Sequence, residues 1–380
     1  MIKRLLEKSI DENLFKGKTL IVLGARQVGK TTLLKQIAGK HGKNKTVQWF
    51  NADEIEVQNL FAAPSLASFR AFLQKDALVI IDEAQNIKDI GIKLKLIHDN
   101  MPGIQLLVSG SSAFELANTL NEPLTGRKLE FILYPLSFEE MALHHSLFEE
   151  HKLLKTRLVF GYYPGIVVNI GNNIIQALKQ LTNSYLYKDI LIWSRIKKSD
   201  KLVKLLQALA FQVGNQVSYN ELAQLVGLDN ETVENYIQLL EQSFIIYRLP
   251  SFSRNLRNEL KRSRKIYFYD NGIRNALINN FNPVELRNDT GALWENFIIT
   301  ERLKYISYHQ IYALRYFWRT YSQQEIDYIE EYNGKLYAYE FKWNPRKKAK
   351  IPKTFMENYP EAEVKVITPE NYFEFIYPQQ

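Results

Sequence analysis

The chain has 380 residues, of which 46% are hydrophobic, and a formal net charge of +8. At roughly 100–200 residues per domain, this length predicts two to four domains, and the hydrophobic content excludes an intrinsically disordered chain. Cysteine is absent, which excludes disulfides, thiolate catalysis and thiolate zinc sites. No apolar run approaches the roughly 18 residues of a membrane span, and the amino terminus lacks the core of a signal peptide. We therefore expect a soluble cytoplasmic protein with no membrane partner.

The first part of the chain alternates short apolar runs with helical patterns. The runs at 19–23, 77–81 and 104–108 are apolar on both faces, which is typical of parallel strands covered by helices. This alternation predicts an α/β domain with a parallel sheet at residues 1–136. The mostly helical patterns at 137–200 then predict a helical lid.

The sequence GARQVGKTT lies between the first apolar run and a helical pattern. It matches G-x-x-x-x-G-K-[ST] in full, and its strand–helix context is that of a phosphate-binding loop (P-loop) rather than an ordinary glycine turn. Its backbone amides would face phosphates, Lys30 would neutralise the β- and γ-phosphates as a catalytic cation, and Thr31 would bind Mg²⁺. We therefore expect ATP and Mg²⁺ as cofactors. The predicted nucleotide-binding residues of the loop are Gly24, Ala25, Arg26, Gln27, Val28, Gly29, Lys30, Thr31 and Thr32.

Two acidic residues follow the second apolar run, in LVIIDEAQNI. Asp82 would hold Mg²⁺ through water, and Glu83 would polarise the attacking water as general base. A helix cap after a strand is the alternative interpretation. The Asp-Glu pair favours hydrolysis over nucleotide binding alone.

Polar residues near the end of the domain are candidates for contact with the γ-phosphate. Ser109 or Ser111, at the end of LLVSGSSAF, could act as a sensor, although a strand-ending turn explains them equally well. Arg127, in LTGR, could stabilise transition-state charge, and a solvated surface arginine is the default interpretation.

Taken in order, GARQVGKTTLL, LVIIDEAQNI, LLVSGSSAFEL, LTGRKLEFILYPLSFEE and GYYPGIV resemble a prokaryotic family of AAA-like ATPases related to the STAND group. The resemblance covers nearly the whole chain. It implies Lys30 and Thr31 at phosphate and Mg²⁺, Asp82 at Mg²⁺, Glu83 as base and Arg127 as an arginine finger or sensor. A finger acting in trans would require a homo-oligomer, whose turnover per subunit should rise with protein concentration. Many AAA ATPases have an asparagine sensor where this chain has serines.

Residues 201–270 have the pattern of a winged helix. Ser218 and Glu221 predict a capping box for one helix, and a short glycine-containing turn leads to the next. Strands at 244–249 and 265–269 would form the wing. Basic residues near these strands make DNA or another nucleic acid a candidate partner, although the second helix is acidic and a module packed only against protein is the alternative. These basic residues are Arg254, Arg257, Lys261, Arg262, Arg264 and Lys265.

Residues 271–380 contain a second candidate site. Glu295 lies in a helical pattern, Asp327 in a strand pattern, and Glu340 and Lys342 on one face of the next strand. This order resembles the PD-(D/E)XK nuclease core.

An Asn333-Gly334 hairpin turn would bring the strands of Asp327 and Glu340 together. We expect Asp327, Glu340 and Glu295 to bind one divalent cation, with Lys342 orienting or deprotonating water. The alternative is a solvated strand face with a lysine–glutamate pair.

The leading interpretation is ATP hydrolysis with Mg²⁺, coupled to a C-terminal nuclease-like domain. One alternative is a nucleotide-switched signalling or scaffold protein whose nuclease-like domain is catalytically dead. Another is an ATP-gated, metal-dependent DNA nuclease. Stimulation of turnover by DNA would favour a role on nucleic acid, and cut product in Mg²⁺ would select the nuclease.

Overall fold

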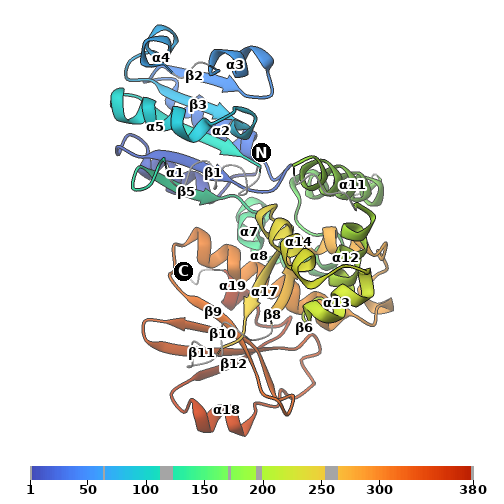
Figure 1. Cartoon of the computed structure of the whole chain (residues 1–380). Coiled ribbons are helices and arrows are strands. Elements are labelled where there is room, and N and C mark those ends of the chain that lie inside the picture. The colour runs from blue at the N-terminus through green and yellow to red at the C-terminus, as the bar shows by residue number, and fades with distance from the viewer. Residues whose placement is uncertain are drawn as a thin grey trace. The chain divides into compact units, whose positions relative to one another are not determined.

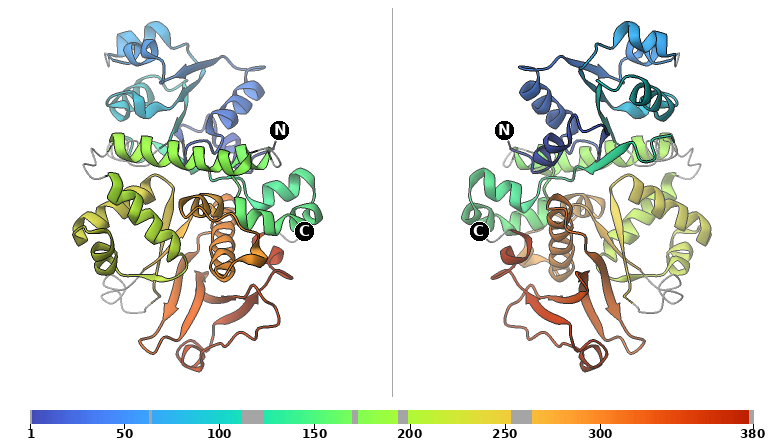
Figure 2. Two further views of the ribbon diagram at one scale, coloured as in Figure 1. Left: turned by 90° about the vertical axis from the view of Figure 1, so that its right-hand side faces the viewer. Right: turned by 90° about the vertical axis from the view of Figure 1, so that its left-hand side faces the viewer.

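The computed structural model describes residues 2–62, 65–111, 123–169, 173–193, 199–252 and 264–377. The chain divides into two compact units, 1–135 with 242–244 and 136–241 with 245–380 (Figure 1 and Figure 2). The regions predicted as lid, winged helix and nuclease-like domain therefore lie mainly in one unit. No described helix is long and apolar enough to cross a membrane.

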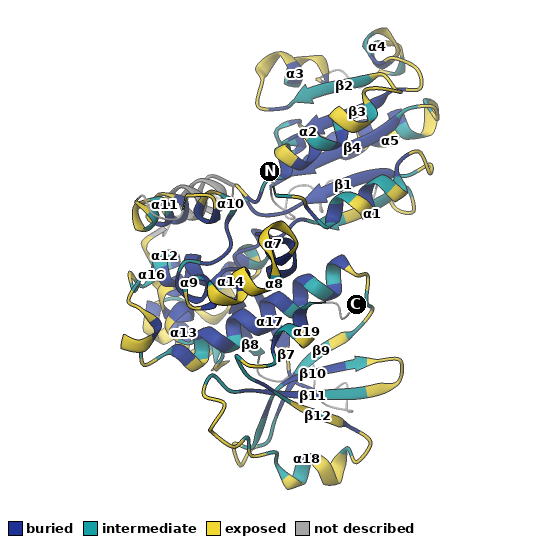
Figure 3. Cartoon of the chain, turned by 180° about the vertical axis from the view of Figure 1, so that it is seen from behind, coloured by how far each residue is buried: buried dark blue, intermediate teal, exposed yellow. Residues whose placement is uncertain are grey.

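The N-terminal unit is built on a five-stranded sheet with the order β2-β3-β4-β1-β5. All its strand pairs are parallel, and β1, β3 and β4 are buried along their whole length (Figure 3). This confirms the predicted α/β fold with a parallel sheet, whose strands are apolar on both faces. The strands are β1 (Thr19–Leu23), β2 (Val47–Asn51), β3 (Leu78–Asp82), β4 (Gln105–Gly110) and β5 (Lys128–Ile132). The helices are α1 (Leu6–Asn13), α2 (Lys30–His41), α3 (Ile55–Leu60), α4 (Leu66–Phe72) and α5 (Ile90–Asn100), with a 3-10 turn η1 (Ala84–Asn86).

The second unit begins with a run of helices and contains an antiparallel sheet of order β6-β8-β7. Ser218 caps α13 by accepting a hydrogen bond from the Glu221 amide, and Gly227 ends this helix in the left-handed conformation. The helices are α7 (Phe138–His145), α8 (Leu147–Lys152), α9 (Leu154–Phe160), α10 (Pro164–Val167), α11 (Ile174–Trp193), α12 (Ser199–Phe211), α13 (Tyr219–Val226) and α14 (Asn230–Gln242). The strands are β6 (Gln216–Val217), β7 (Ile246–Pro250) and β8 (Arg264–Phe268).

Of the six basic residues predicted to contact nucleic acid, Arg264 and Lys265 are described by the structure. Arg254, Arg257, Lys261 and Arg262 lie outside the described residues. Lys265, in contrast, has a side chain that is only 1% exposed. A buried ammonium cannot reach a phosphate in solution, so the prediction was wrong for Lys265.

The rest of the second unit contains a four-stranded sheet of order β12-β11-β10-β9. Strands β9, β10 and β11 form an antiparallel meander, and β12 pairs parallel with β11. Asn333 and Gly334 both have positive φ, as the predicted two-residue hairpin requires. The strands are β9 (Leu314–Arg319), β10 (Glu325–Tyr332), β11 (Lys335–Phe341) and β12 (Glu363–Ile367). The helices are α16 (Asn271–Leu277), α17 (Thr290–Tyr308), α18 (Lys353–Asn358) and α19 (Phe373–Ile376), with a 3-10 turn η2 (Val284–Leu286).

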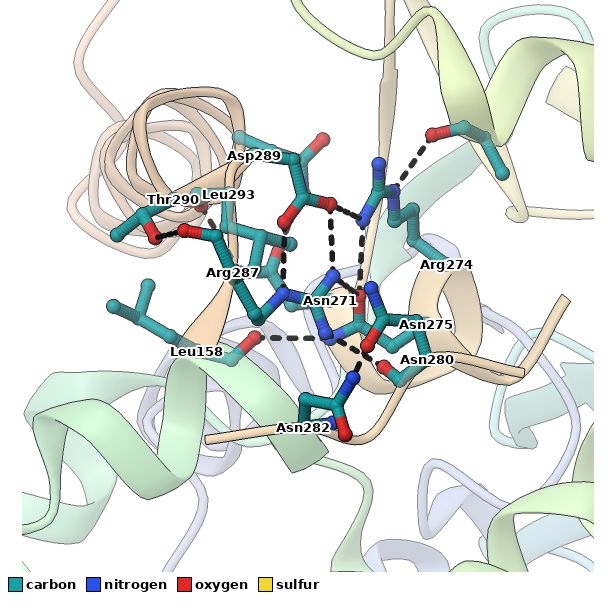
Figure 4. A network of polar contacts seen from close by, with 12 residues as sticks. Leu158, Asn271, Arg274, Asn275, Asn280, Asn282, Arg287, Asp289, Thr290 and Leu293 are labelled. Carbon is teal, nitrogen blue, oxygen red and sulfur yellow. Dashed lines mark hydrogen bonds and ion pairs between the residues drawn. The ribbon is translucent and has the colours of Figure 1, made fainter. Parts of the chain in front are cut away.

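A polar network fixes the start of α17 against α16 (Figure 4). Both Asp289 carboxylate oxygens accept hydrogen bonds from Arg287, at 2.8 Å each, and Arg274 also donates to Asp289. Arg274 reaches the Ala210 carbonyl as well, at 2.7 Å. Burial alone would raise the pKa of Asp289, but the two arginines lower it to about 2. One carboxylate therefore balances two buried cations at a junction of three helices.

We expect Asp289→Asn to lower the free energy of unfolding of the second unit by about 2–4 kcal/mol, since it leaves two buried cations without their anion. Because the folded pKa lies below the ordinary 3.8, the carboxylate stabilises above about pH 4, and this contribution disappears as pH falls towards 2. The free energy of unfolding of the Asp289→Asn variant should not show this loss between about pH 4 and pH 2. Denaturant unfolding followed by tryptophan fluorescence measures it, since four of the five tryptophans lie in this unit.

The matched control is Glu285→Gln, four residues earlier. Glu285 pairs with Lys155 on the surface, where both side chains are more than half exposed. Surface pairs contribute little, so this variant should have nearly the stability of the unmodified protein. Equal losses in the two variants would contradict a special role for the network.

Candidate functional site

The loop from Gly24 to Gly29 connects β1 to α2. Gly24 has no room for a side chain, because an added Cβ would collide with the Leu133 carbonyl oxygen, and Gly29 has a φ of 98°. The Lys30 ammonium is buried and donates to the carbonyls of Gly24 at 3.0 Å and Ala25 at 2.9 Å. The lysine thus folds back over the loop, at the amino-terminal end of a helix where backbone amides favour anions.

Asp82 ends β3 and meets the loop at the carboxyl edge of the sheet. The Thr31 hydroxyl donates to Asp82 Oδ2 at 2.7 Å, and the Ser109 hydroxyl, on β4, donates to Asp82 Oδ1. A hydroxyl and a carboxylate in contact are hard oxygen donors of the kind that Mg²⁺ accepts. Thr31 and Asp82 therefore fit the predicted cation.

Glu83 is held next to Asp82 in an unusual backbone conformation. Its φ and ψ are 52° and 43°, a left-handed geometry that costs free energy in a residue other than glycine. Its amide donates to Ser109 Oγ at 3.1 Å, and its carboxylate accepts a hydrogen bond from Gln85. Gln85 also donates to Ser111 Oγ at 3.0 Å.

Both candidate sensor serines therefore lie in one hydrogen-bonded group with the two acids. Gln85 belongs to that group and was missed by the sequence analysis. Its position two residues after Glu83 was the available signal.

Arg127 lies at the amino ends of the strands, opposite the end of the sheet where the P-loop lies. It precedes β5, and its carbonyl accepts a hydrogen bond from the Thr19 amide at 2.8 Å, at the start of β1. The P-loop follows Leu23 at the end of β1, about 13 Å away along the strand. The Arg127 guanidinium instead pairs with Asp99 at 2.7 Å, and this hydrogen bond lowers the pKa of Asp99.

The structure thus does not bring Arg127 to the P-loop of its own chain. This position does not support Arg127 as a sensor of the nucleotide in its own chain. A role in trans, at the nucleotide of a second copy, stays a prediction.

The acid–lysine cluster of the second unit is defined as Asp327, Glu340 and Lys342. Asp327 lies on β10, Glu340 lies on the neighbouring strand β11, and Lys342 directly follows β11. The Lys342 ammonium lies 2.7 Å from Glu340 Oε2 and 3.7 Å from Asp327 Oδ2. Asp327 Oδ2 also accepts the Phe341 amide at 2.8 Å. Burial and the Asp327 charge raise the pKa of Glu340 to about 7. Burial would lower the pKa of Lys342, but the two carboxylates raise it overall.

Glu295 is paired differently from the prediction. Its Oε1 accepts hydrogen bonds from Lys265 at 2.9 Å and from the Tyr267 hydroxyl at 2.6 Å, both on β8. Lys265 also forms an ion pair with Glu325 at 2.5 Å. An added Cβ on Gly214 would lie 3.4 Å from the Glu295 carboxylate, so the backbone at Gly214 covers another side of this carboxylate.

The predicted three-carboxylate metal site is therefore not assembled. Within the described ranges, no group of three or more His, Asp or Glu side chains gathers in a metal-holding arrangement. The Glu295 carboxylate is instead paired with a buried ammonium, so its role as a metal ligand stays a prediction. Asp327 and Glu340 remain adjacent and could hold one hard cation together with water.

The chain matches three family models in succession. An AAA domain model covers residues 16–142. This part of the chain is similar to AAA domains. Two domains of unknown function follow, DUF8612 at residues 151–284 and DUF4143 at residues 290–375.

Similar proteins come from bacteria and archaea. An uncharacterized protein of Mycobacterium tuberculosis is 25% identical over 333 residues, which cover 87% of this chain and 71% of that protein. An uncharacterized protein of Methanocaldococcus jannaschii is 24% identical over 269 residues, which cover 66% and 60% of the two chains. A solved Walker-type ATPase of Pyrococcus abyssi has a TM-score of 0.51 at 15% identity, over 73% of this chain and 96% of that chain. This last likeness shows a shared fold.

Proposed function

We propose that the protein binds ATP with Mg²⁺ at the P-loop and hydrolyses it. The observation that carries this proposal is the 2.7 Å contact between Thr31 and Asp82, which joins the loop to the acidic end of β3. A nucleotide cation needs these two oxygen donors side by side. When bound, Mg²⁺ would neutralise charge on the β- and γ-phosphate oxygens.

The chain's own groups then have distinct tasks. Lys30 leaves the carbonyls of Gly24 and Ala25 and pairs with the phosphates, and the loop amides hold the remaining oxygens. Glu83 accepts a proton from the attacking water, and Gln85 keeps its carboxylate oriented. Ser109 links Asp82 to the Glu83 amide, so the cation-binding and water-activating residues move together.

Calorimetry with ATP in Mg²⁺ and in EDTA, followed by a phosphate-release assay, tests this proposal on the unmodified protein. We expect binding that tightens with Mg²⁺ and steady release of phosphate. Absence of ATP binding would refute it.

A metal-dependent nuclease activity is the second candidate function. It is supported by the contact of Lys342 with Asp327 and Glu340. Helix α17, which carries Glu295, also precedes the β9-β10-β11 meander with Asp327 and Glu340, in the order that the resemblance implies. DNA is the candidate substrate, and ATP turnover in the first unit would control access to it. The helices α12–α14 with the sheet β6-β8-β7 would serve as a winged helix.

We expect Asp327→Asn to reduce cleavage of plasmid DNA in Mg²⁺ or Mn²⁺ by at least about 100-fold, because a neutral amide is a poor ligand for a hard cation. ATP turnover should be unchanged, since Asp327 and the P-loop lie in different units. Glu331→Gln, on the same strand, is the control and should cut normally. If the unmodified protein binds DNA without cutting it, the scaffold alternative replaces the nuclease.

A further inference from the structure

Arg4 is a buried cation next to the P-loop that the proposed reaction has not used. It precedes α1 and is 5% exposed. Its Nη1 donates to the Val28 carbonyl at 2.6 Å, and its Nη2 donates to the Tyr134 carbonyl at 2.7 Å. Val28 belongs to the loop itself, whereas Tyr134 follows β5.

We propose that Arg4 is a positioning residue of the P-loop, which holds the Val28 carbonyl from behind and thereby aims the Gly29 amide at the phosphates. This inference rests on the proposed ATP binding. The Val28 carbonyl and the Gly29 N–H belong to one peptide unit. In a planar trans peptide these two groups point in opposite directions, and no described peptide bond is cis. A donor that fixes the carbonyl on one side therefore fixes the N–H on the other.

The backbone at this position needs such support. Gly29 has a φ of 98°, and a glycine loses more conformational freedom on ordering than any other residue. A hydrogen bond from a guanidinium is charge-assisted and also polarises the amide, which makes its N–H a better donor to an anion.

The guanidinium lies directly against the loop. A Cβ added to Gly29 would be 3.4 Å from Arg4 Nη1. Arg4 thus adds positive charge behind the amides at the start of α2, where phosphate charge would be concentrated. Its second hydrogen bond, to Tyr134, anchors the guanidinium to the segment after β5. A lysine could make one of these contacts but not the fork of two.

The experiment compares Arg4→Met and Arg4→Lys with Lys93→Met. Lys93, on α5, is a matched control because it is also a buried cation of the N-terminal unit. It donates to the Lys88 carbonyl, which precedes α5, rather than to the loop. Calorimetry with ATP and with inorganic tripolyphosphate gives the affinities, and thermal unfolding gives the stability of each variant. Tripolyphosphate isolates the phosphate contacts from those of the base.

We expect Arg4→Met to lower the affinity for both ligands by the same factor, about 10- to 100-fold. The affinities of Arg4→Lys should lie between those of Arg4→Met and the unmodified protein. Lys93→Met should lower the melting temperature but keep the ATP affinity within about twofold. Unchanged ligand affinity in Arg4→Met, an equal loss in Lys93→Met, or a loss for ATP without a loss for tripolyphosphate would each overturn the inference.

Arg4→Lys keeps the test decisive if the methionine variant does not fold, because a folded lysine variant with unmodified affinity also contradicts the inference. Failure of the unmodified protein to bind ATP would refute the proposed function, and this inference with it. Normal ATP binding and hydrolysis in the Arg4 variants would refute this inference alone.

Discussion

Lys30→Ala should lower ATP affinity by at least about 100-fold and reduce hydrolysis further. The Lys30 ammonium is the group that folds over the loop, within 3.0 Å of two of its carbonyls. Alanine removes this cation from the place where phosphate charge would accumulate, and only the backbone amides remain to hold the anion. Calorimetry and phosphate release on the purified variant measure the two effects separately.

Two further variants separate this effect from damage to the fold. Lys30→Met keeps an apolar stem in the buried position and should lose affinity to the same extent as alanine, with a smaller loss of thermal stability. Lys35→Ala, on the exposed side of the same helix, should bind ATP normally. Normal ATP binding by Lys30→Ala would refute the assignment of the site.

Glu83→Gln should bind ATP normally and hydrolyse it about 100- to 10,000-fold more slowly. The amide has the size of the carboxylate and can still accept the hydrogen bond from Gln85, but it cannot take a proton from water. Glutamine and glutamate also bear the same cost of the left-handed backbone at this position, so stability should not change. Single-turnover hydrolysis with excess enzyme is the appropriate measurement.

The control for this substitution is Glu54→Gln, an exposed acid of the same unit. It should hydrolyse ATP at the rate of the unmodified protein. If Glu83→Gln did the same, Glu83 would be only a turn residue at the end of β3.

The P-loop and the acidic strand end could be predicted because their chemistry is local. A nine-residue segment contains the whole phosphate loop, and a run of five apolar residues at 77–81 places Asp82 at the carboxyl end of its strand. The Asn333-Gly334 turn was predictable for the same reason, since positive φ at both residues is a property of the dipeptide.

Arg127 shows that a sequence motif alone does not reveal at which end of a parallel sheet a residue lies. In a parallel sheet, residues that precede a strand lie at the amino ends of the strands, and residues that follow a strand lie at the carboxyl ends. Arg127 precedes β5 and the P-loop follows β1, so the two were separated by topology although the motif order suggested a common site.

The pairing of Glu295 with Lys265 could not be predicted from either residue alone. Lys265 stands next to a basic stretch and has the sequence context of an exposed cation, yet it is buried between two glutamates. Contacts between residues 30 and 60 positions apart decide this burial. A weak signal existed, because Lys265 and Tyr267 share one face of β8 and both reach Glu295.

The strand order β2-β3-β4-β1-β5 has a consequence for synthesis on the ribosome. The first strand made, β1, is a central strand, and its two neighbours are formed by residues 105–110 and 128–132. At about 5–20 residues per second, β1 waits roughly 5–20 s for the second neighbour. Its apolar residues lack at least one of their two strand partners during that interval, and exposed strand edges of this kind invite aggregation. Nascent chains that stop before β5 should therefore need chaperones rather than form a smaller working domain.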